Sequence, residues 1–308
     1  MTFSPLLLMT ALSLPMLPAT EIRIERREGA VDILVAGQKV TTLEFGTAWD
    51  KPFLYPLRTP SGVVVTRGWP VAEREGDSKD HFFHRGLFFA HRDINGVDFW
   101  SERVAVKTGK IVVRQAPVWR KGALTFTGDL MPPEGPRLGS VREEYRFALL
   151  GKAYEVEARL SFAADGGVDL KLGDTEEAAL GVRLAEEFRE DRGAVLLNST
   201  GLIGTKKIWG QRAEWVDYST TRDNRPVGVA ILDHPGNPRH PTYWHARGYG
   251  LNAANAFGIR NFTKDQTQDG SMTVAKGQSL TFRYLIILHD GDAAAAKVAA
   301  RFDAWKKK

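Results

Sequence analysis

Short stretches in which apolar and polar residues alternate run through most of the chain. Residues 21–25 and 31–35 alternate in this way, and further short apolar runs lie at residues 168–172, 181–185, 195–197, 227–232 and 281–288. Alternation is typical of β-strands with one buried face, because successive side chains point to opposite sides of a sheet. The pattern therefore predicts a protein built mainly from β-strands.

Three pairs of such stretches predict β-hairpins. Asn95-Gly96, the strongest short turn signal, separates residues 86–94 from 97–100. Residues 120–122 join 111–119 to 123–130, and Gly151-Lys152 joins 141–150 to 153–162. Successive hairpins with Gly, Pro, Asn and Asp between them favour an all-β fold, a large antiparallel β-sandwich.

One helix is predicted, close to the C-terminus. Val298, Phe302 and Trp305 follow the i, i+4, i+7 spacing of a single helix face, and Asp292 is a suitable N-cap. We expect this helix to pack on a sheet as a C-terminal lid. No linker or repeat divides the chain, so we expect residues 20–308 to form a single β-sandwich domain.

The N-terminus has the character of an export signal. Residues 3–19 contain no charged residue, and residues 5–14 resemble the apolar region of a signal peptide. Leu17-Pro18-Ala19 is a candidate cleavage site, so we predict a signal peptide over residues 1–19 and a periplasmic or extracellular protein. The sequence has no apolar run of about 18 residues or more, and a membrane span is therefore not expected.

Composition excludes several classes of function. The 308 residues include no cysteine, which excludes a disulfide scaffold and any thiolate metal site. The net charge of +5 is small, and the basic residues are scattered along the chain. Nucleic-acid binding would require a dense basic stripe, so we do not expect it.

Histidine carries the most specific chemical signal in this sequence. Six of the seven histidines lie in two stretches, residues 81–91 and 234–245; they are His81, His84, His91, His234, His240 and His245. Histidine titrates nearest to neutral pH and is the commonest metal ligand. The two stretches therefore predict a polar site surrounded by aromatic residues.

In the first stretch, strand geometry suggests a pocket. If residues 86–94 form a strand, His91 shares a face with Leu87 and Phe89, and His84 lies at the start of the strand. The returning chain would bring Asp98 and Trp100 next to His91. The alternative is that these histidines are structural and bind the backbone at one end of a sheet.

The second stretch predicts a stiff loop. Pro235, Pro238 and Pro241 fix the backbone and remove hydrogen-bond donors. A stiff loop on a rigid scaffold is a common place for binding residues. The loop and the residues after it combine aromatic faces with hydrogen-bonding groups, which suits a sugar: Arg239, His240, Trp244, His245 and Asn255. A packed surface loop is the alternative.

These stretches supply the candidate site residues. We predict that four histidines act in acid–base catalysis: His84, His91, His240 and His245. We predict that Arg85 and Arg239 neutralise substrate charge, that Trp100 and Trp244 stack on a sugar ring, and that Asp98 and Asn255 also bind substrate. Sequence alone does not choose the carboxylate that assists the histidines.

A metal site is an open alternative. Two residues separate His81 from His84, and their context is strand-like. This spacing is not the helical His-Glu-x-x-His motif. Ligands from both stretches could still converge on one metal ion. We nevertheless predict no metal ligand and no cofactor. The serine-nucleophile, phosphate-loop and dinucleotide-binding motifs are also absent from the sequence.

Several segments resemble the bacterial PmoA-like family, often labelled "methane oxygenase PmoA". The matching segments are residues 51–57, 81–100, 209–210 and 233–258. Phe83 departs from the family, which has histidine there in many members, and Arg92 stands where glycine is usual. The resemblance implies a galactose-mutarotase-like supersandwich, a fold whose enzymes commonly act on carbohydrates with a histidine and a carboxylate. We do not expect oxygenase activity, because a membrane oxygenase subunit needs spanning helices.

Together these observations predict an exported carbohydrate-active enzyme, a hydrolase, lyase or epimerase that uses histidine acid–base chemistry. The expected partner is a small carbohydrate, and the oligomeric state is left open. The alternatives are a carbohydrate-binding protein without catalytic activity and a metalloenzyme with histidine ligands.

Overall fold

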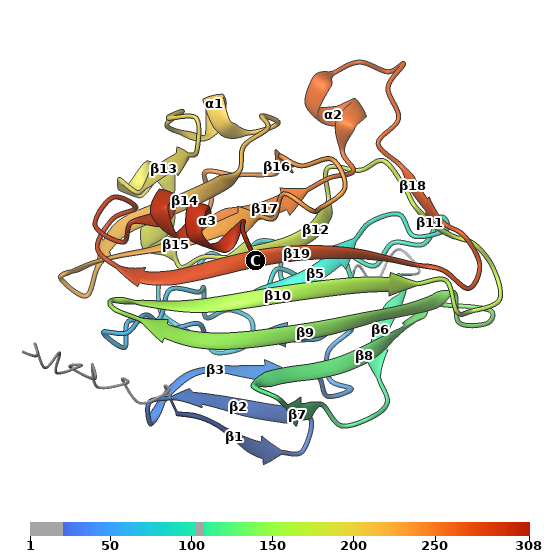
Figure 1. Ribbon diagram of the computed structural model, residues 1–308, viewed down its shortest axis with the longest axis horizontal. Helices are drawn as coiled ribbons and strands as arrows, with labels where there is room; N and C mark the ends of the chain where they lie inside the picture. The colour runs from blue at the N-terminus through green and yellow to red at the C-terminus, as the bar shows by residue number, and fades with distance from the viewer. Residues whose placement is uncertain (1–20, 103–107) are drawn as a thin grey trace, which may run out of the picture.

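The computed structural model describes residues 21–102 and 108–308, and two large antiparallel sheets account for most of them (Figure 1). The first sheet contains eight strands: β1 (Ile22–Arg27), β2 (Ala30–Val35), β3 (Gln38–Glu44), β4 (Phe53–Leu54), β5 (Leu87–His91), β12 (Ala178–Arg183), β16 (Tyr243–Trp244) and β17 (Leu251–Asn255). Their order is β1-β2-β3-β4-β5-β12-β17-β16.

The second sheet contains nine strands: β6 (Lys110–Val113), β7 (Val118–Arg120), β8 (Ala123–Met131), β9 (Gly139–Leu150), β10 (Ala153–Ala163), β13 (Val195–Asn198), β14 (Trp215–Arg222), β15 (Arg225–Asp233) and β19 (Ser279–Asp290). Their order is β13-β14-β15-β19-β10-β9-β8-β6, and β7 also pairs with β8. Strands β11 (Leu170–Leu172) and β18 (Met272–Val274) form a small separate sheet.

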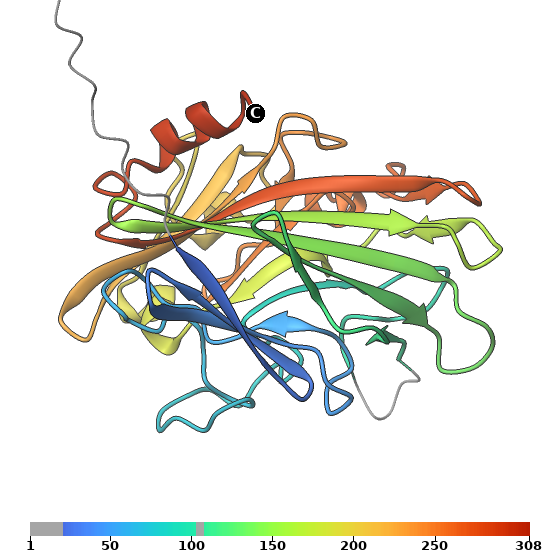
Figure 2. The ribbon, with the colours of Figure 1, turned by 60° about the horizontal axis from the view of Figure 1, so that its bottom comes forward.

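The helices are short: α1 (Thr205–Ile208), α2 (Ile259–Thr263), α3 (Val298–Trp305) and the 3₁₀ turns η1 (Glu186–Phe188) and η2 (Glu190–Arg192). The predicted fold class, an all-β antiparallel sandwich with a C-terminal helix, is therefore confirmed. The core lies between the two sheets, where Val31 and Ile33 of β2 belong to one apolar cluster with Leu124 and Phe126 of β8. The two layers are visible in Figure 2.

The predicted hairpins are confirmed in part. Strands β9 and β10 pair in register, with Ala153 opposite Leu150. Asn95 and Gly96 both have positive φ, as their turn requires, but residues 97–100 form no strand, and one bridge between Ile94 and Val97 closes the turn. The predicted strand 111–119 is instead two strands, β6 and β7, and both pair with β8.

The C-terminal helix packs with the predicted face inward. Val298, Phe302 and Trp305 are buried in one cluster with Leu285 and Ile287 on the outer side of β19. The predicted cap is wrong, because α3 begins at Val298. The Asp292 carboxylate instead accepts the N–H of Ala295 at 2.8 Å in the preceding turn.

Strand β5 is buried on both of its faces, and this positions the candidate site. Leu87 and Phe89 face the core between the sheets, whereas Phe88 and Ala90 face outward. A second apolar cluster covers that outer face; it includes Phe53, Phe83, Phe88, Trp100, Leu251 and Ala253. The loop that precedes β5 therefore lies over the outer side of the eight-stranded sheet.

None of the helices within residues 21–102 and 108–308 is long and apolar enough to cross a membrane. The predicted signal peptide, residues 1–19, lies outside the described residues.

Candidate functional site

A stack of four rings brings the first histidine stretch against Tyr249, which follows the second stretch in the sequence. The ring of His81 lies 5.0 Å from that of Tyr249 on one side and 5.1 Å from that of His84 on the other, centroid to centroid. The His84 ring continues the stack onto Phe88 at 5.5 Å. Residues 81–84 and the turn that contains Tyr249 therefore meet over the outer face of β5, β12 and β17.

Gly86 allows the loop to take this position. Its φ is +53°, and a Cβ atom there would lie 2.0 Å from the carbonyl oxygen of Leu54 in β4. Only glycine adopts this backbone without strain and also leaves room for the neighbouring strand. The close turn at Gly86 thus sets the path by which residues 80–85 cross the sheet.

Asp80 pairs with His81, whose ring lies between Tyr249 and His84 in the stack. The Nδ1 atom of His81 lies 3.4 Å from the Asp80 carboxylate, which also accepts hydrogen bonds from Arg67 at 2.6 Å and from Arg183 at 2.7 Å. Burial alone would raise the pKa of Asp80, but the His81 hydrogen bond and the charges of Arg183 and Arg67 outweigh it and hold that pKa well below its usual range. Asp80 is therefore ionised and oriented toward His81.

The two arginines hold the loop in place. Both side chains are fully buried, and Arg67 donates to the backbone carbonyls of Asp80 at 2.8 Å and His81 at 2.9 Å. The Arg183 guanidinium lies 4.6 Å from the centre of the Tyr249 ring. Its Nε and Nη1 atoms have no hydrogen-bond partner among the described residues. Two buried nitrogen atoms of Arg183, beside the ring stack, are therefore unused as hydrogen-bond donors.

His84 forms the buried floor of the stack. Burial is the main reason that its pKa lies well below the usual value, and the charge of Arg183 adds to the effect. Neither ring nitrogen has a partner in the described part of the chain. The rings of Phe83 and Trp100 contact its ring edge-on, at 4.7 and 5.1 Å. His84 is therefore neutral at pH 7, and His81 covers it.

A charged layer lies beneath these rings. Lys51 donates to the Trp100 carbonyl at 3.0 Å and pairs with Glu102, which also accepts from Arg85 at 2.6 Å. Burial is the main cause that lowers the pKa of Lys51 to about 8. The Arg85 guanidinium also lies 4.8 Å from the ring of Trp49. Arg85 thus neutralises Glu102 in this structure, and the prediction that it contacts substrate does not fit its position.

His245 lies on the same outer face of the sheet. Its N–H donates to the carbonyl of Ala253, which pairs with Gly181, and Gly181 in turn pairs with Phe88. The His245 Nδ1 atom lies 3.4 Å from Glu176, and this histidine holds the pKa of Glu176 below its usual value, mainly through a hydrogen bond. His245 therefore lies on the same face as Phe88 but three strands away from it, and it is itself buried.

His91 lies elsewhere, and the prediction that it acts as a base does not fit. Strand parity correctly placed it with Leu87 and Phe89, but that face is the core. Its ring is fully buried, packs edge-on to Phe257 at 4.8 Å, and accepts the N–H of Asp93 at 3.1 Å. Burial lowers its pKa to about 3. The Asp98 carboxylate instead shapes the next turn, where it accepts the N–H of Trp100 at 2.7 Å.

The two tryptophans predicted to stack on a sugar are also buried. Trp100 is 1% exposed and Trp244 is 0% exposed. The Trp244 indole N–H donates to the carbonyl of Ala213 at 2.9 Å. Neither ring offers a free face, because both are used to fill the interior.

The remaining predicted residues anchor the loop at residues 233–258. Arg239 donates to the carbonyls of Ala256 at 2.9 Å and Ser271 at 3.0 Å, and Asn255 donates to that of Glu176 at 2.8 Å. His240 bonds Asp233 at 2.8 Å, and its ring lies parallel to that of Phe302 in α3. These groups are engaged in holding the loop and the helix, so the structure does not bring them to the ring stack.

Five residues at the ring stack were missed by the sequence analysis: Arg67, Asp80, His81, Arg183 and Tyr249. The adjacent pair Asp80-His81 was a usable signal, because a carboxylate next to a histidine can orient it. Arg67 and Arg183 gave no local signal, since only sheet pairing and loop packing bring them to Asp80.

Within the described residues, no group of three or more His, Asp or Glu side chains is arranged to hold a metal ion. The predicted absence of a metal and of a cofactor is not tested by this geometry. Phe83, which stands where many relatives were expected to have histidine, packs edge-on against the rings of both His81 and His84.

Comparisons with known proteins show a family but no function. The model of a family of unknown function, DUF6807, matches residues 30–303. No curated protein sequence matches the chain. The resemblance to the PmoA-like family is neither supported nor contradicted by these matches.

Solved structures give weak similarities only. A galactose mutarotase-like protein from Clostridium acetobutylicum shares 8% identity, with a TM-score of 0.35 over 89% of this chain and 99% of its own. A galactose mutarotase related enzyme from Lactobacillus acidophilus shares 9%, with a TM-score of 0.39 over 87% and 97%. A GH36 α-galactosidase from Geobacillus stearothermophilus, in complex with raffinose, shares 11%, with a TM-score of 0.40 over 88% of this chain and 41% of its own. Scores this low assign neither substrate nor reaction.

Proposed function

The chain belongs to the DUF6807 family, and we propose that it is an exported enzyme that acts on a carbohydrate through the Asp80–His81 pair. The observation that supports this most is the exposure of the Asp80–His81 pair beside two buried arginines. The His81 side chain is 39% exposed, whereas the side chains of Arg67 and Arg183 behind it are 0% exposed. A titratable group held by buried charges and open to solvent is the arrangement that acid–base catalysis requires.

The pair can transfer a proton at a defined atom. Because Nδ1 of His81 is turned toward the Asp80 carboxylate, Nε2 is left to exchange a proton with a substrate. Asp80 stabilises the imidazolium that forms when His81 accepts a proton. Arg67 and Arg183 keep Asp80 ionised throughout, so the carboxylate stays an acceptor and His81 carries the proton.

The surroundings suit a sugar. Tyr249 and His81 provide ring edges, against which the apolar face of a sugar ring can pack. The buried positive charge of Arg183 beside the pair can stabilise an oxygen on which negative charge develops. Proton transfer of this kind serves a hydrolase, a lyase or an epimerase, which are the reaction classes that we propose.

The test is a substrate panel combined with matched histidine variants. Purified protein is incubated with glucose, galactose, galacturonate and their methyl glycosides, and NMR follows anomerisation, elimination and hydrolysis. The variants are His81→Asn and, as a control, His234→Asn, since His234 contacts Arg283 and the ring of Trp305. We expect His81→Asn to reduce turnover by roughly 10²–10⁴-fold, the usual contribution of a general acid–base group.

Retained turnover in His81→Asn, with a melting temperature equal to that of the wild type, would overturn the proposal. Saturable sugar binding without turnover on any member of the panel would favour the non-catalytic binding protein.

A further inference from the structure

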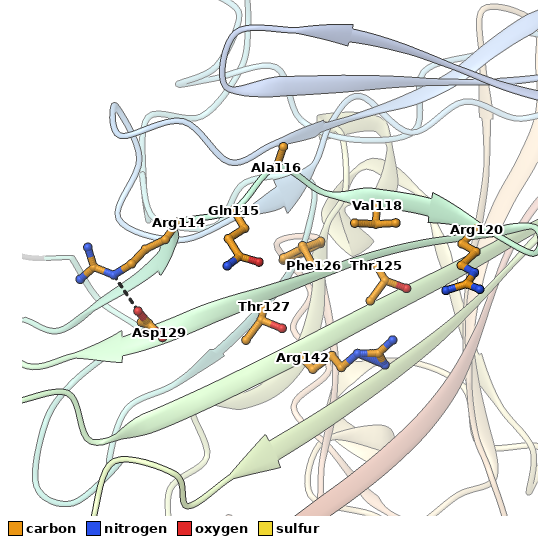
Figure 3. Close-up of a pocket in the computed structure, with 10 residues that line it drawn as sticks. All are labelled: Arg114, Gln115, Ala116, Val118, Arg120, Thr125, Phe126, Thr127, Asp129 and Arg142. Atoms are coloured by element: carbon orange, nitrogen blue, oxygen red, sulfur yellow. Dashed lines mark hydrogen bonds and ion pairs between the residues drawn. The ribbon is translucent and has the colours of Figure 1, made fainter.

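A hollow lies on the nine-stranded sheet, across the outer face of β7, β8 and β9 (Figure 3). Its volume is about 580 Å³. Arg114 stands at one end of the hollow and Arg120 at the other, with Thr125, Thr127 and Arg142 between them. These side chains do not belong to the ring stack at His81, which lies on the eight-stranded sheet.

Strand pairing explains the hollow. Both β6 and β7 pair with β8, so the chain between them, residues 114–117, crosses above the edge of β8. The core-facing residues of β8 include Leu124 and Phe126, which leaves Thr125 and Thr127 on the outer face. Thr127 pairs with Arg142 of β9, so that arginine rises beside the hydroxyl.

The hollow continues across the sheet. A second cavity of about 330 Å³ shares Arg120, Thr125 and Arg142 with the first and adds Arg146. A third of about 110 Å³ shares Arg146 with the second and reaches Arg159 on β10. The three form one trough over β7, β8, β9 and β10, and three strand spacings give it a width of about 14 Å. We call this feature the arginine trough.

The arginine trough is cationic but not uniformly so. Its lining includes six basic residues, Arg114, Arg120, Lys121, Arg142, Arg146 and Arg159, and three acidic residues, Asp129, Glu144 and Glu157. Three of the arginines have acidic partners, since Arg114 bonds Asp129 at 2.7 Å, Arg146 bonds Glu144 at 2.8 Å, and Arg142 lies 3.5 Å from Glu144. Arg120 makes no ion pair with a described residue, which leaves net positive charge for a ligand.

We propose that the arginine trough binds an acidic polysaccharide, a chain of uronate sugars. A guanidinium binds a carboxylate through two parallel hydrogen bonds, which suits the repeated carboxylates of such a chain. The hydroxyl groups of the polysaccharide can donate to Asp129 and Glu144 and accept from Thr125 and Thr127. A mixed lining of this kind matches a ligand that carries both carboxylates and hydroxyls.

Two other ligands fit less well. A neutral glycan would need an exposed aromatic platform, and the aromatic residue in the lining, Phe126, is only 4% exposed. Nucleic acid would need many phosphate contacts, and three carboxylates within the trough oppose them. Charge complementarity therefore favours the uronate chain, which would be held on a different sheet from the Asp80–His81 pair.

The test uses oligogalacturonate of six or more sugars, with maltohexaose and a single-stranded DNA oligomer as comparison probes. Affinities are measured by calorimetry at low and at physiological salt. The trough variant is Arg120→Ser with Arg142→Ser, and the control variant, Arg23→Ser with Arg192→Ser, removes the same charge from exposed positions elsewhere. We expect saturable oligogalacturonate binding that the trough variant weakens roughly tenfold and the control variant changes less than about twofold.

Equal weakening in both variants would overturn the proposal, because it would mark binding to net charge alone. Tighter binding of maltohexaose or DNA than of oligogalacturonate, or the absence of any binding, would also overturn it. Catalytic activity at His81 is not needed for this measurement, so the two proposals can fail separately.

Discussion

Glu143 should make the folded protein less stable as the pH rises. This residue is on β9 and its side chain faces the core between the two sheets, where it is 2% exposed. The Tyr145 hydroxyl donates to one carboxylate oxygen at 2.6 Å, and the other oxygen has no partner among the described residues. A carboxylate in this position favours its neutral, protonated form.

The size of the effect follows from the pKa. Burial raises the pKa of Glu143 from 4.5 to about 7, against the smaller opposing effect of the Tyr145 hydrogen bond. Between these two values the folded state keeps the proton that the unfolded chain has lost. The free energy of unfolding therefore decreases as pH rises from about 4.5 to 7, by about 3 kcal/mol in all. Glu143→Gln removes this loss because the amide stays neutral and can still accept from Tyr145.

The assay is denaturant unfolding of the wild type and Glu143→Gln at pH 4.5, 6, 7 and 8, followed by tryptophan fluorescence. We expect the variant to gain about 3 kcal/mol relative to the wild type between pH 4.5 and pH 8. Glu144→Gln is the control, since Glu144 is on the outer face of the same strand and pairs with Arg146. Parallel pH profiles for the wild type and Glu143→Gln would refute the burial of a protonated carboxyl in this core.

Three further predictions concern the helix, the loop and the site. Phe302→Ala should lower the free energy of unfolding by about 3–5 kcal/mol, as it does for other buried aromatic residues, and chemical denaturation measures this loss. A loss below about 1 kcal/mol would mean that α3 does not cover β19. Gly86→Ala should destabilise the protein by at least about 2 kcal/mol, and more than Gly96→Ala, because both glycines have positive φ but only a Cβ at Gly86 would meet neighbouring backbone. Equal losses would contradict the close approach of Gly86 to the Leu54 carbonyl. Asp80→Asn should lower kcat about 100-fold or more for whichever sugar is turned over, with little change in KM and an altered pH–rate profile. An unchanged pH–rate profile would mean that Asp80 is structural.

The sequence was most informative where one face of a strand is buried and the other is exposed. Strands β9 and β10 alternate in this way, and their hairpin was predicted almost to the residue. Strand β14 was missed because most of its residues, from Trp215 to Ser219, are buried on both sides and do not alternate. Periodicity identifies strands that separate core from solvent, and it loses strands that run through the interior.

The site was predictable in region but not in detail. Strand parity placed His91 on one face with Leu87 and Phe89, yet it could not tell which face of β5 was the core, since both faces are apolar. The pairing of β5 with β12 brings Arg183 to Asp80, and no pattern in the sequence specifies that pairing. The first histidine stretch thus supplies the candidate pair, but its exposed member, His81, was not among the predicted catalytic residues.

The most direct test of the central claim is a crystal structure of the protein soaked with a sugar that the wild type turns over. The account predicts density for that sugar against the rings of His81 and Tyr249, with a hydrogen bond between the sugar and Nε2 of His81. Density for the sugar only at other surfaces, with the Asp80–His81 pair untouched, would contradict it.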